Sequence, residues 1–139
     1  MHHLAILSEK LNLLHKILSG EKTIESRWYK FKKTPYKNIT VGDTIYLKES
    51  GELTKAKAEV KETLFFDNLN EEKMKEILEI YGKQLCVDVS YLEKVKDKRY
   101  CTLIFLDNIE NVEPFAINKS GYGNMAAWIT VNDISEIKL

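Results

Sequence analysis

The chain has 139 residues, of which 44% are apolar and 30% charged, and its formal net charge is zero. This length fits one domain with a buried core, so we expect a single domain over residues 1–139. No apolar run approaches the roughly 18 residues of a membrane span, and the N-terminus lacks a signal-peptide pattern. We therefore expect a cytoplasmic protein with no membrane partner.

Although the net charge is zero, the charges are distributed unevenly along the chain. Residues 1–66 hold 12 Lys/Arg and 8 Asp/Glu (+4), whereas residues 67–139 hold 9 and 13 (−4). The excess is concentrated in residues 22–37, which carry six basic side chains and one acid, Glu25. A local basic patch can bind phosphates in a neutral protein, because salt screening restricts each contact to about 10 Å.

The cysteines and histidines predict neither a metal site nor a cofactor. Cys86 and Cys101 have no CxxC spacing and are too few for a disulfide scaffold, so we expect two free thiols. The three histidines, His2, His3 and His15, have no acid or thiol at metal-ligand spacing in the sequence.

Residues 8–20 are typical of an amphipathic helix, with Ser8 as N-cap and Gly20 just past the end. Three leucines at helical spacing form its apolar stripe: Leu11, Leu14 and Leu18. His15 is expected on the same face, at the edge of the core; a role as ligand or catalyst is the alternative.

A strand is predicted over residues 23–29, where polar and apolar residues alternate. One face is suited to a core and carries Ile24, Ser26 and Trp28. The other is a polar row of Thr23, Glu25, Arg27 and Tyr29.

The remaining elements alternate between strands and helices. Two strands around a turn are expected within residues 41–60, with Ala56, Ala58 and Val60 pointing inward. A helix should run from Asn70 to Gly82, and a short one over residues 88–97. A strand buried on both faces follows at 99–115, then a glycine-bearing loop, then short strands at 126–131 and 134–139. The pattern predicts an α+β fold.

The charged corner from Gly20 to Arg27 is the sharpest local feature. Lys22, Glu25 and Arg27 follow a helix end and share a strand whose other face is apolar. Such a cluster can bind an anion, or move protons if burial changes the lysine's basicity. The alternative is an ordinary solvated face.

These residues resemble the ASCH family of the PUA-like superfamily. Gly20, Lys22, Glu25 and Arg27 match its G-x-K-x-x-E-x-R signature, and Gly42-Asp43 matches a later strand start. The strand pair at 53–65 and the segment "GYGNMAAWITV" also fit, so the resemblance covers most of the chain except a helical insert at 69–97.

The resemblance implies a small, curved β-barrel with two to three flanking helices. It also implies a cleft, lined by Lys22, Glu25 and Arg27, that binds RNA or a nucleotide-like ligand. A purely structural interaction domain is a further alternative.

If the chain is an enzyme, the resemblance implies a hydrolase of a modified nucleoside such as N4-acetylcytidine, or a ribonuclease. Lys22 and Glu25 would be the catalytic residues. This sequence departs from the amidohydrolase pattern, because Glu25 occupies the position of the threonine nucleophile. The downstream glutamate of that pattern would be Glu76 or Glu79.

The basic and aromatic residues 27–37 favour nucleic acid independently of the family. Five cations can contact phosphates: Arg27, Lys30, Lys32, Lys33 and Lys37. Tyr29 and Tyr36 are expected to be exposed and to stack on bases, whereas Trp28 alternates with Ile24 and is expected in the core. The alternative is a loop whose lysines serve only solubility. In "SGYGN", residues 120–124, Tyr122 is expected to reach over the cleft; an ordinary turn is the alternative.

Overall fold

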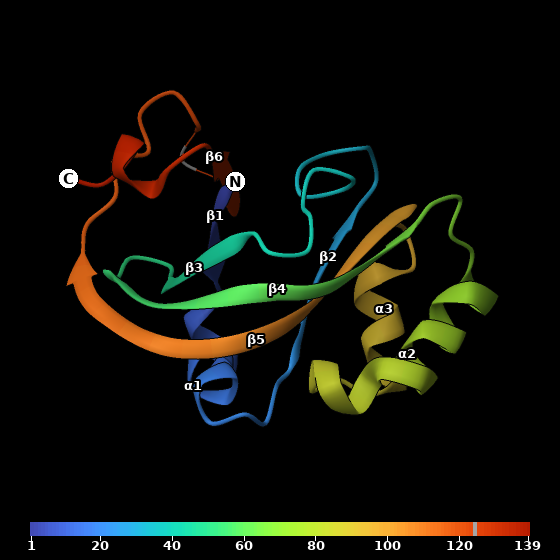
Figure 1. Cartoon of the computed structure of the whole chain (residues 1–139). Helices are drawn as coiled ribbons and strands as arrows, with labels where there is room; N and C mark the ends of the chain where they lie inside the picture. Colours follow the sequence, from blue (N-terminus) through green and yellow to red (C-terminus); the bar gives the residue numbers. More distant parts are fainter. Residues whose placement is uncertain (124) are drawn as a thin grey trace.

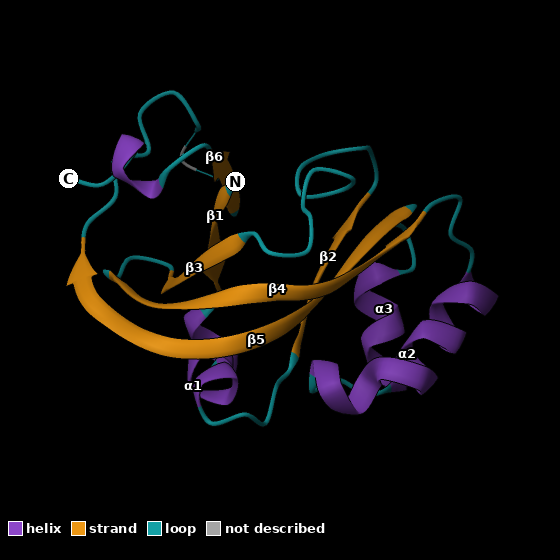
Figure 2. Cartoon of the chain, viewed as in Figure 1, coloured by secondary structure: helices purple, strands orange, loops and turns teal. Residues whose placement is uncertain are grey.

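Six strands form one mixed sheet in the order β2-β5-β4-β3-β1-β6 (Figures 1 and 2). The computed structural model describes residues 1–123 and 125–139; Asn124, the last residue of the predicted "SGYGN" loop, lies outside them. β1 and β3 are parallel, and the other neighbouring pairs are antiparallel. The strands are β1 His2–Leu7, β2 Ile24–Tyr29, β3 Thr44–Glu49, β4 Thr54–Phe66, β5 Tyr100–Phe115 and β6 Trp128–Val131.

The sheet is curled into a half-barrel by its two longest strands. Figure 1 shows β4 and β5 running side by side along the molecule and curving together. Their register shifts at three places, and such bulges bend a strand pair and increase its twist. The small residues predicted to point inward, Ala56, Ala58 and Val60, are buried along β4, as the alternation indicated. The curved sheet of the predicted α+β fold is therefore confirmed.

The described chain contains three α-helices, within the predicted two to three. They are α1 Leu13–Leu18, α2 Glu71–Leu85 and α3 Leu92–Val95, and short 3-10 turns lie at Glu9–Leu11, Val89–Tyr91 and Ile134–Glu136. α2 and α3 lie side by side at the end of the molecule away from both termini (Figure 1). None of the described helices is long and apolar enough to cross a membrane.

The first half of strand β5 separates two apolar cores, because residues 101–106 are buried or partly buried on both faces, as predicted for the apolar run; most of residues 107–114 are exposed. Leu103 packs with residues of α2 and α3, whereas the next residue, Ile104, packs inside the curl with Leu14 and Ile17 of α1. Cross-strand pairing then places the side chains of β2. Glu25 lies opposite Ile104 and therefore faces the interior of the curl. Ile24 and Trp28 pack in the core on the helix side.

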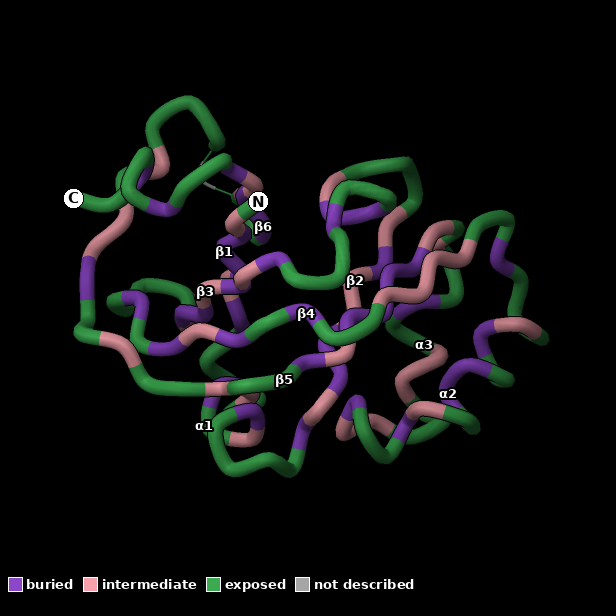
Figure 3. The backbone as a smooth tube through the Cα atoms, viewed as in Figure 1, coloured by how far each residue is buried: buried purple, intermediate pink, exposed green. Residues whose placement is uncertain are grey.

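Strand β1 was not predicted from the sequence, yet it is central to the sheet. It lies between β3 and β6 and is buried along most of its length (Figure 3). Residues 134–139 were predicted as a strand, but Ile134–Glu136 form a 3-10 turn, and Lys138 makes only an isolated bridge with Ile117. Asp133 and Glu136 cap this turn reciprocally, and that local bonding favours a helical turn over an extended chain.

The first predicted helix is broken at Asn12, which adopts a left-handed conformation with φ 54°. Ser8 caps the 3-10 turn before the break, as expected. The helical period restarts after Asn12, so the buried residues of α1 are Leu14 and Ile17. The predicted stripe was wrong at Leu11 and Leu18, which are exposed, and His15 is also exposed rather than at the core edge.

Helix α2 begins at the predicted cap, Asn70, but continues past Gly82 to Leu85. Gly82 lies inside the helix because the chain folds back against it. The carbonyl oxygen of Val87 lies 2.8 Å from where a Cβ at this position would be. Here glycine permits a close backbone approach and does not mark a helix end.

Replacing Gly82 by alanine should therefore destabilise the protein by about 1–2 kcal/mol, although alanine is normally the better helix former. The added methyl group would push the Val87 backbone away. Chemical denaturation of Gly82→Ala, with the exposed Glu79→Ala on the same helix as control, checks this. A Gly82→Ala variant as stable as the native protein would contradict the assignment.

Candidate functional site

A cleft of about 350 Å³ opens beside β2, between the N-terminal residues 6–13 and the helical insert. Four residues of the predicted site line it: Lys22, Glu25, Arg27 and Tyr29. The helical insert and the residue that follows it contribute three further polar side chains: Tyr91, Lys94 and Lys98. The cleft therefore joins the charged corner to a segment that the sequence analysis left without a role.

Lys22 is almost completely buried at the base of this cleft. Its Nζ donates to the carbonyl oxygens of Ile24 (2.8 Å) and Leu85 (3.0 Å) and lies 3.8 Å from Glu25 Oε1. Because Leu85 is the last residue of α2, Lys22 joins the start of β2 to the end of that helix. It acts here as a structural donor and as the counter-charge of Glu25.

Glu25 is 5% exposed, so the predicted polar row does not face solvent. Its Oε1 accepts the backbone N–H of Ser26 at 2.8 Å. Its Oε2 is closed to solvent and accepts no hydrogen bond from the described residues; the nearest cation is Arg27 Nη2 at 3.7 Å. The buried hydroxyl of Thr102, which lies opposite Arg27 in the β2–β5 register, also lacks a partner there.

Arg27 connects the two ends of the sheet. It belongs to β2, the first strand in the sheet order, yet Nη2 donates to the carbonyl of Ile6 in β1 (3.3 Å) and Nη1 to that of Ala127 just before β6 (3.1 Å). Its guanidinium carbon lies 5.2 Å from the centre of the Trp128 ring. These contacts hold the guanidinium between the sheet edges and beside Glu25.

Tyr91 is the main cleft residue that sequence reasoning missed. Its ring packs edge-on against Trp28, with centroids 6.5 Å apart. Burial raises the pKa of its hydroxyl, the charge of Glu25 adds to this effect, and Arg27 opposes it. Tyr91 and Lys94 have i, i+3 spacing, so a search for a polar stripe on the short helix predicted over residues 88–97 would have found these two; Lys98 lies just beyond it.

The basic segment after Tyr29, residues 30–37, is called the basic flank here, and none of its residues belongs to the described cleft lining. The predicted site residues Lys30, Lys32, Lys33 and Tyr36 are among them. Lys30 pairs with Asp97 at 3.2 Å, and Lys33 Nζ lies 4.7 Å from the centre of the Tyr29 ring. Lys33 is therefore the flank lysine shown to contact a cleft residue.

Tyr36 was wrongly predicted to be exposed. It is 8% exposed, with its ring packed edge-on against Phe65 and Tyr100 at centroid distances of 5.6 and 5.1 Å. The loop turns back over the sheet after Lys33, so this aromatic residue becomes part of the packing. Phe31, which points outward at 77% exposure, is the aromatic side chain that the flank presents to solvent.

Three other candidates lie away from the cleft. Glu76 and Glu79 are exposed on α2, and neither belongs to the described cleft lining, so neither supplies the downstream glutamate of the amidohydrolase pattern there. Tyr122 is 44% exposed on the loop before β6 and is likewise absent from that lining.

The two cysteines are free, as predicted, and burial raises the pKa of the Cys101 thiol well above its usual value. Among residues 1–123 and 125–139, no three His, Cys, Asp or Glu side chains gather in an arrangement that could hold a metal ion.

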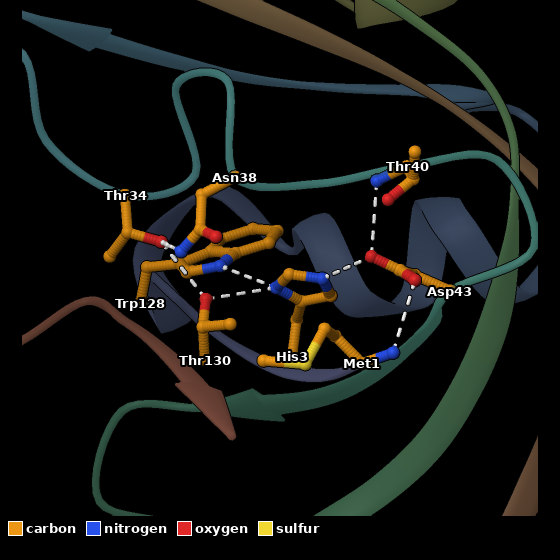
Figure 4. Close-up of polar contacts among 8 residues, drawn as sticks. All are labelled: Met1, His3, Thr34, Asn38, Thr40, Asp43, Trp128 and Thr130. Atoms are coloured by element: carbon orange, nitrogen blue, oxygen red, sulfur yellow. Dashed lines mark hydrogen bonds and ion pairs between the residues drawn. The ribbon is translucent and has the colours of Figure 1, made fainter. Parts of the chain in front are cut away.

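A second polar cluster surrounds the completely buried His3 (Figure 4). His3 Nε2 lies 2.8 Å from Asp43 Oδ2, and Nδ1 lies 3.0 Å from Thr130 Oγ1 and 3.2 Å from Trp128 Nε1. Sequence spacing could not reveal this cluster, since its members come from two distant strands, β1 and β6, and from the turn before β3.

Comparison with known proteins gives a match at the level of the fold. The sequence matches no protein-family model and no curated protein. Crystal structures of an ASCH protein from Zymomonas mobilis, ZmASCH, do match. A tyrosine-to-phenylalanine variant of ZmASCH has a TM-score of 0.71 at 12% identity, covering 97% of this chain and 93% of that one. The chain has the ASCH fold.

Two further ZmASCH structures agree with the first. A serine-to-alanine variant has a TM-score of 0.69 at 14% identity, covering 97% of this chain and 91% of that one. A third structure of the protein has a TM-score of 0.61 at 16% identity, over 81% and 71%. In this ASCH fold, the residues of the G-x-K-x-x-E-x-R match lie at the corner that enters β2, with Glu25 and Arg27 directed into the curl.

Replacing Lys22 by methionine should destabilise the ASCH fold by about 3–5 kcal/mol, because it would remove one of the two cations beside the buried Glu25 carboxylate and the ammonium donor of two backbone carbonyls. Denaturation of Lys22→Met, with the exposed Lys75→Met as control, measures this. The double variant Lys22→Met/Glu25→Gln should recover part of the loss. Equal stability of Lys22→Met and Lys75→Met would refute the structural role.

Proposed function

We propose that this ASCH-fold chain binds single-stranded RNA, or a nucleotide-like ligand, in the cleft beside β2. Glu25 accepts a hydrogen bond from the edge of a base. The observation that carries the proposal is the buried Oε2 of Glu25, which has no hydrogen-bond partner among the described residues.

Buried polar atoms in folded proteins nearly always have a partner, and leaving one unsatisfied costs about 1–3 kcal/mol, or more for a charged group. A ligand N–H would remove this cost. Amino groups on base edges are suitable donors, and carboxylates accept from them in nucleic-acid recognition. Since the oxygen is closed to solvent, a donor reaches it only when a neighbouring side chain moves.

The cleft walls suit the rest of a nucleotide. Tyr29 and Tyr91 offer aromatic surface, and stacking on a base is worth about 1–3 kcal/mol. Lys94 and Lys98 lie among its lining residues, and Lys33 lies against Tyr29. These cations can contact phosphates while the base points toward Glu25.

A second cavity of about 410 Å³ favours a strand over a single nucleotide. It shares five lining residues with the cleft, so the two form one groove: Leu11, Leu13, Val87, Tyr91 and Lys94. It adds Lys16 and Lys83, which extend the row of cations. A nucleic-acid strand has evenly spaced phosphates, which could contact this longer row of lysines.

The contacts of Lys22 favour binding over hydrolysis. A catalytic base must reach the substrate, whereas Lys22 is buried and its Nζ is directed at the carbonyl oxygens of Ile24 and Leu85. The expected glutamates Glu76 and Glu79 are absent from the described cleft lining. Incubation with N4-acetylcytidine and with RNA, followed by chromatography, accompanies the binding test. Turnover that Glu25→Gln abolishes would favour the enzyme instead.

Titration of a short fluorescein-labelled single-stranded RNA of mixed sequence tests the proposal. Affinity should fall with salt, with a log–log slope of about −0.7 for each phosphate contact. Glu25→Gln should weaken binding roughly tenfold or more, because the base donor loses a charged acceptor. Lys94→Met should lower the salt slope by about one contact.

Lys55→Met, an exposed substitution on β4 outside the described cleft lining, is the matched control and should bind normally. The proposal fails if RNA does not bind at low salt, or if Glu25→Gln and Lys55→Met bind equally well.

A further inference from the structure

Trp128 lies between the cleft and the buried His3 cluster. Its ring is next to the Arg27 guanidinium, 5.2 Å from ring centre to Cζ, while its indole N–H donates to His3 Nδ1 at 3.2 Å. Figure 4 shows this hydrogen bond together with that from His3 to Asp43. One side chain therefore contacts both the cation beside Glu25 and a titratable residue inside the core.

The tautomer of His3 follows from its partners. An indole N–H can only donate, so His3 Nδ1 must accept. The ring proton is then on Nε2, which donates to Asp43 Oδ2 at 2.8 Å. Asp43 is itself held by the backbone N–H of Thr40 at 3.0 Å. With Nδ1 as acceptor, His3 is neutral and its orientation is fixed from both sides.

Protonation of His3 is incompatible with this arrangement. A proton on Nδ1 could be donated to Thr130 Oγ1, 3.0 Å away, but the nitrogen could no longer accept from Trp128. The indole N–H would then be buried without its acceptor. It would therefore favour a different orientation, and the ring would leave Arg27.

The titratable groups around His3 set the pH at which it takes up a proton. The titratable neighbours are Asp43, the amino group of Met1 and His2. Burial lowers the pKa of His3 below its usual 6.5, while the hydrogen bond and charge of Asp43 oppose this. Burial alone would raise the pKa of Asp43, but its hydrogen bonds from His3 and Thr40 outweigh it and hold that pKa low.

Proton uptake by His3 also changes the stability of the fold. The folded protein binds a proton at His3 less tightly than the unfolded chain does, so neutral His3 stabilises the fold fully above pH 6.5. That contribution declines as the pH falls from 6.5 toward the lowered folded-state pKa.

We propose that Trp128 is a positioning residue for Arg27, held in place by the His3–Asp43 pair, so that uptake of a proton by His3 releases Arg27 and weakens ligand binding in the cleft. The effect on the ligand rests on the proposed function. The coupling between the three side chains does not, and the two can be tested separately.

The first experiment needs no ligand. In ¹⁵N-labelled native protein titrated from about pH 7.5 to pH 5, the Trp128 indole N–H and the Arg27 backbone amide should shift together, with one common midpoint below 6.5. The Trp28 indole is an internal control, because it donates to Ser26 Oγ at 3.0 Å and not to His3. The signal of the Trp28 indole N–H should not shift over this pH range. If the Trp128 and Arg27 signals do not move over this range, the coupling is wrong.

The second experiment measures affinity for the labelled RNA over the same pH range. Native protein should lose roughly 3- to 10-fold in affinity toward acid pH, the equivalent of one cation–π contact. Trp128→Phe keeps a ring beside Arg27 but has no N–H, so this loss should disappear. Trp128→Leu should bind more weakly at every pH, and Trp128→Phe should recover part of that deficit.

The outcomes separate the two proposals. If RNA does not bind at any pH, the proposed function fails, and the resonances alone decide the role of Trp128. If RNA binds and the native protein and Trp128→Phe show the same pH dependence, His3 does not act on the cleft through Trp128.

Discussion

The contact on which the rest of the structure depends is the bridge that Arg27 makes between the two ends of the curled sheet. A half-barrel leaves edge strands with unpaired backbone groups, which a closed barrel would satisfy strand to strand. Here a side chain from β2 donates to carbonyls of Ile6 and Ala127 at the opposite end. The two ends of the sheet are therefore joined by this guanidinium and not by a continuous ladder, and Arg27 lies in the lining of the cleft.

This closure places a charged cluster where a barrel would have apolar packing. Lys22 and Arg27 give two positive charges and Glu25 one negative, and Lys22 and Glu25 are almost completely buried. Buried ion pairs contribute little net stability, because desolvation offsets their attraction. Retention of such a cluster, with one carboxylate oxygen left without a partner, makes sense if a ligand completes it. In this chain the segment carrying Tyr91 and Lys94 forms the wall of the cleft that faces β2.

Much of this could be predicted from the sequence where the signal was local. Alternation along residues 23–29 correctly separated Ile24 and Trp28 from Glu25 and Arg27, since a strand has a fixed period of two. It could not show that the polar face is directed into the curl, because that depends on how distant strands pair. Strand β1 and the His3–Asp43 contact were missed for the same reason. At Gly82 and Asn12 the local pattern predicts the wrong helix bounds. Gly82 permits a close backbone approach inside α2 and does not end the helix, and the left-handed Asn12 divides the first predicted helix in two.

The central claim is that the interior face of β2 is where this chain meets its ligand. The most direct measurement is the change in backbone and side-chain NMR shifts of labelled protein when single-stranded RNA is added. The account predicts the largest changes at Glu25, Arg27, Tyr29 and Tyr91, with the Arg27 guanidinium signals moving most. Changes confined to the exposed lysines of β4, or to Phe31 and its neighbours with Glu25 unaffected, would contradict it.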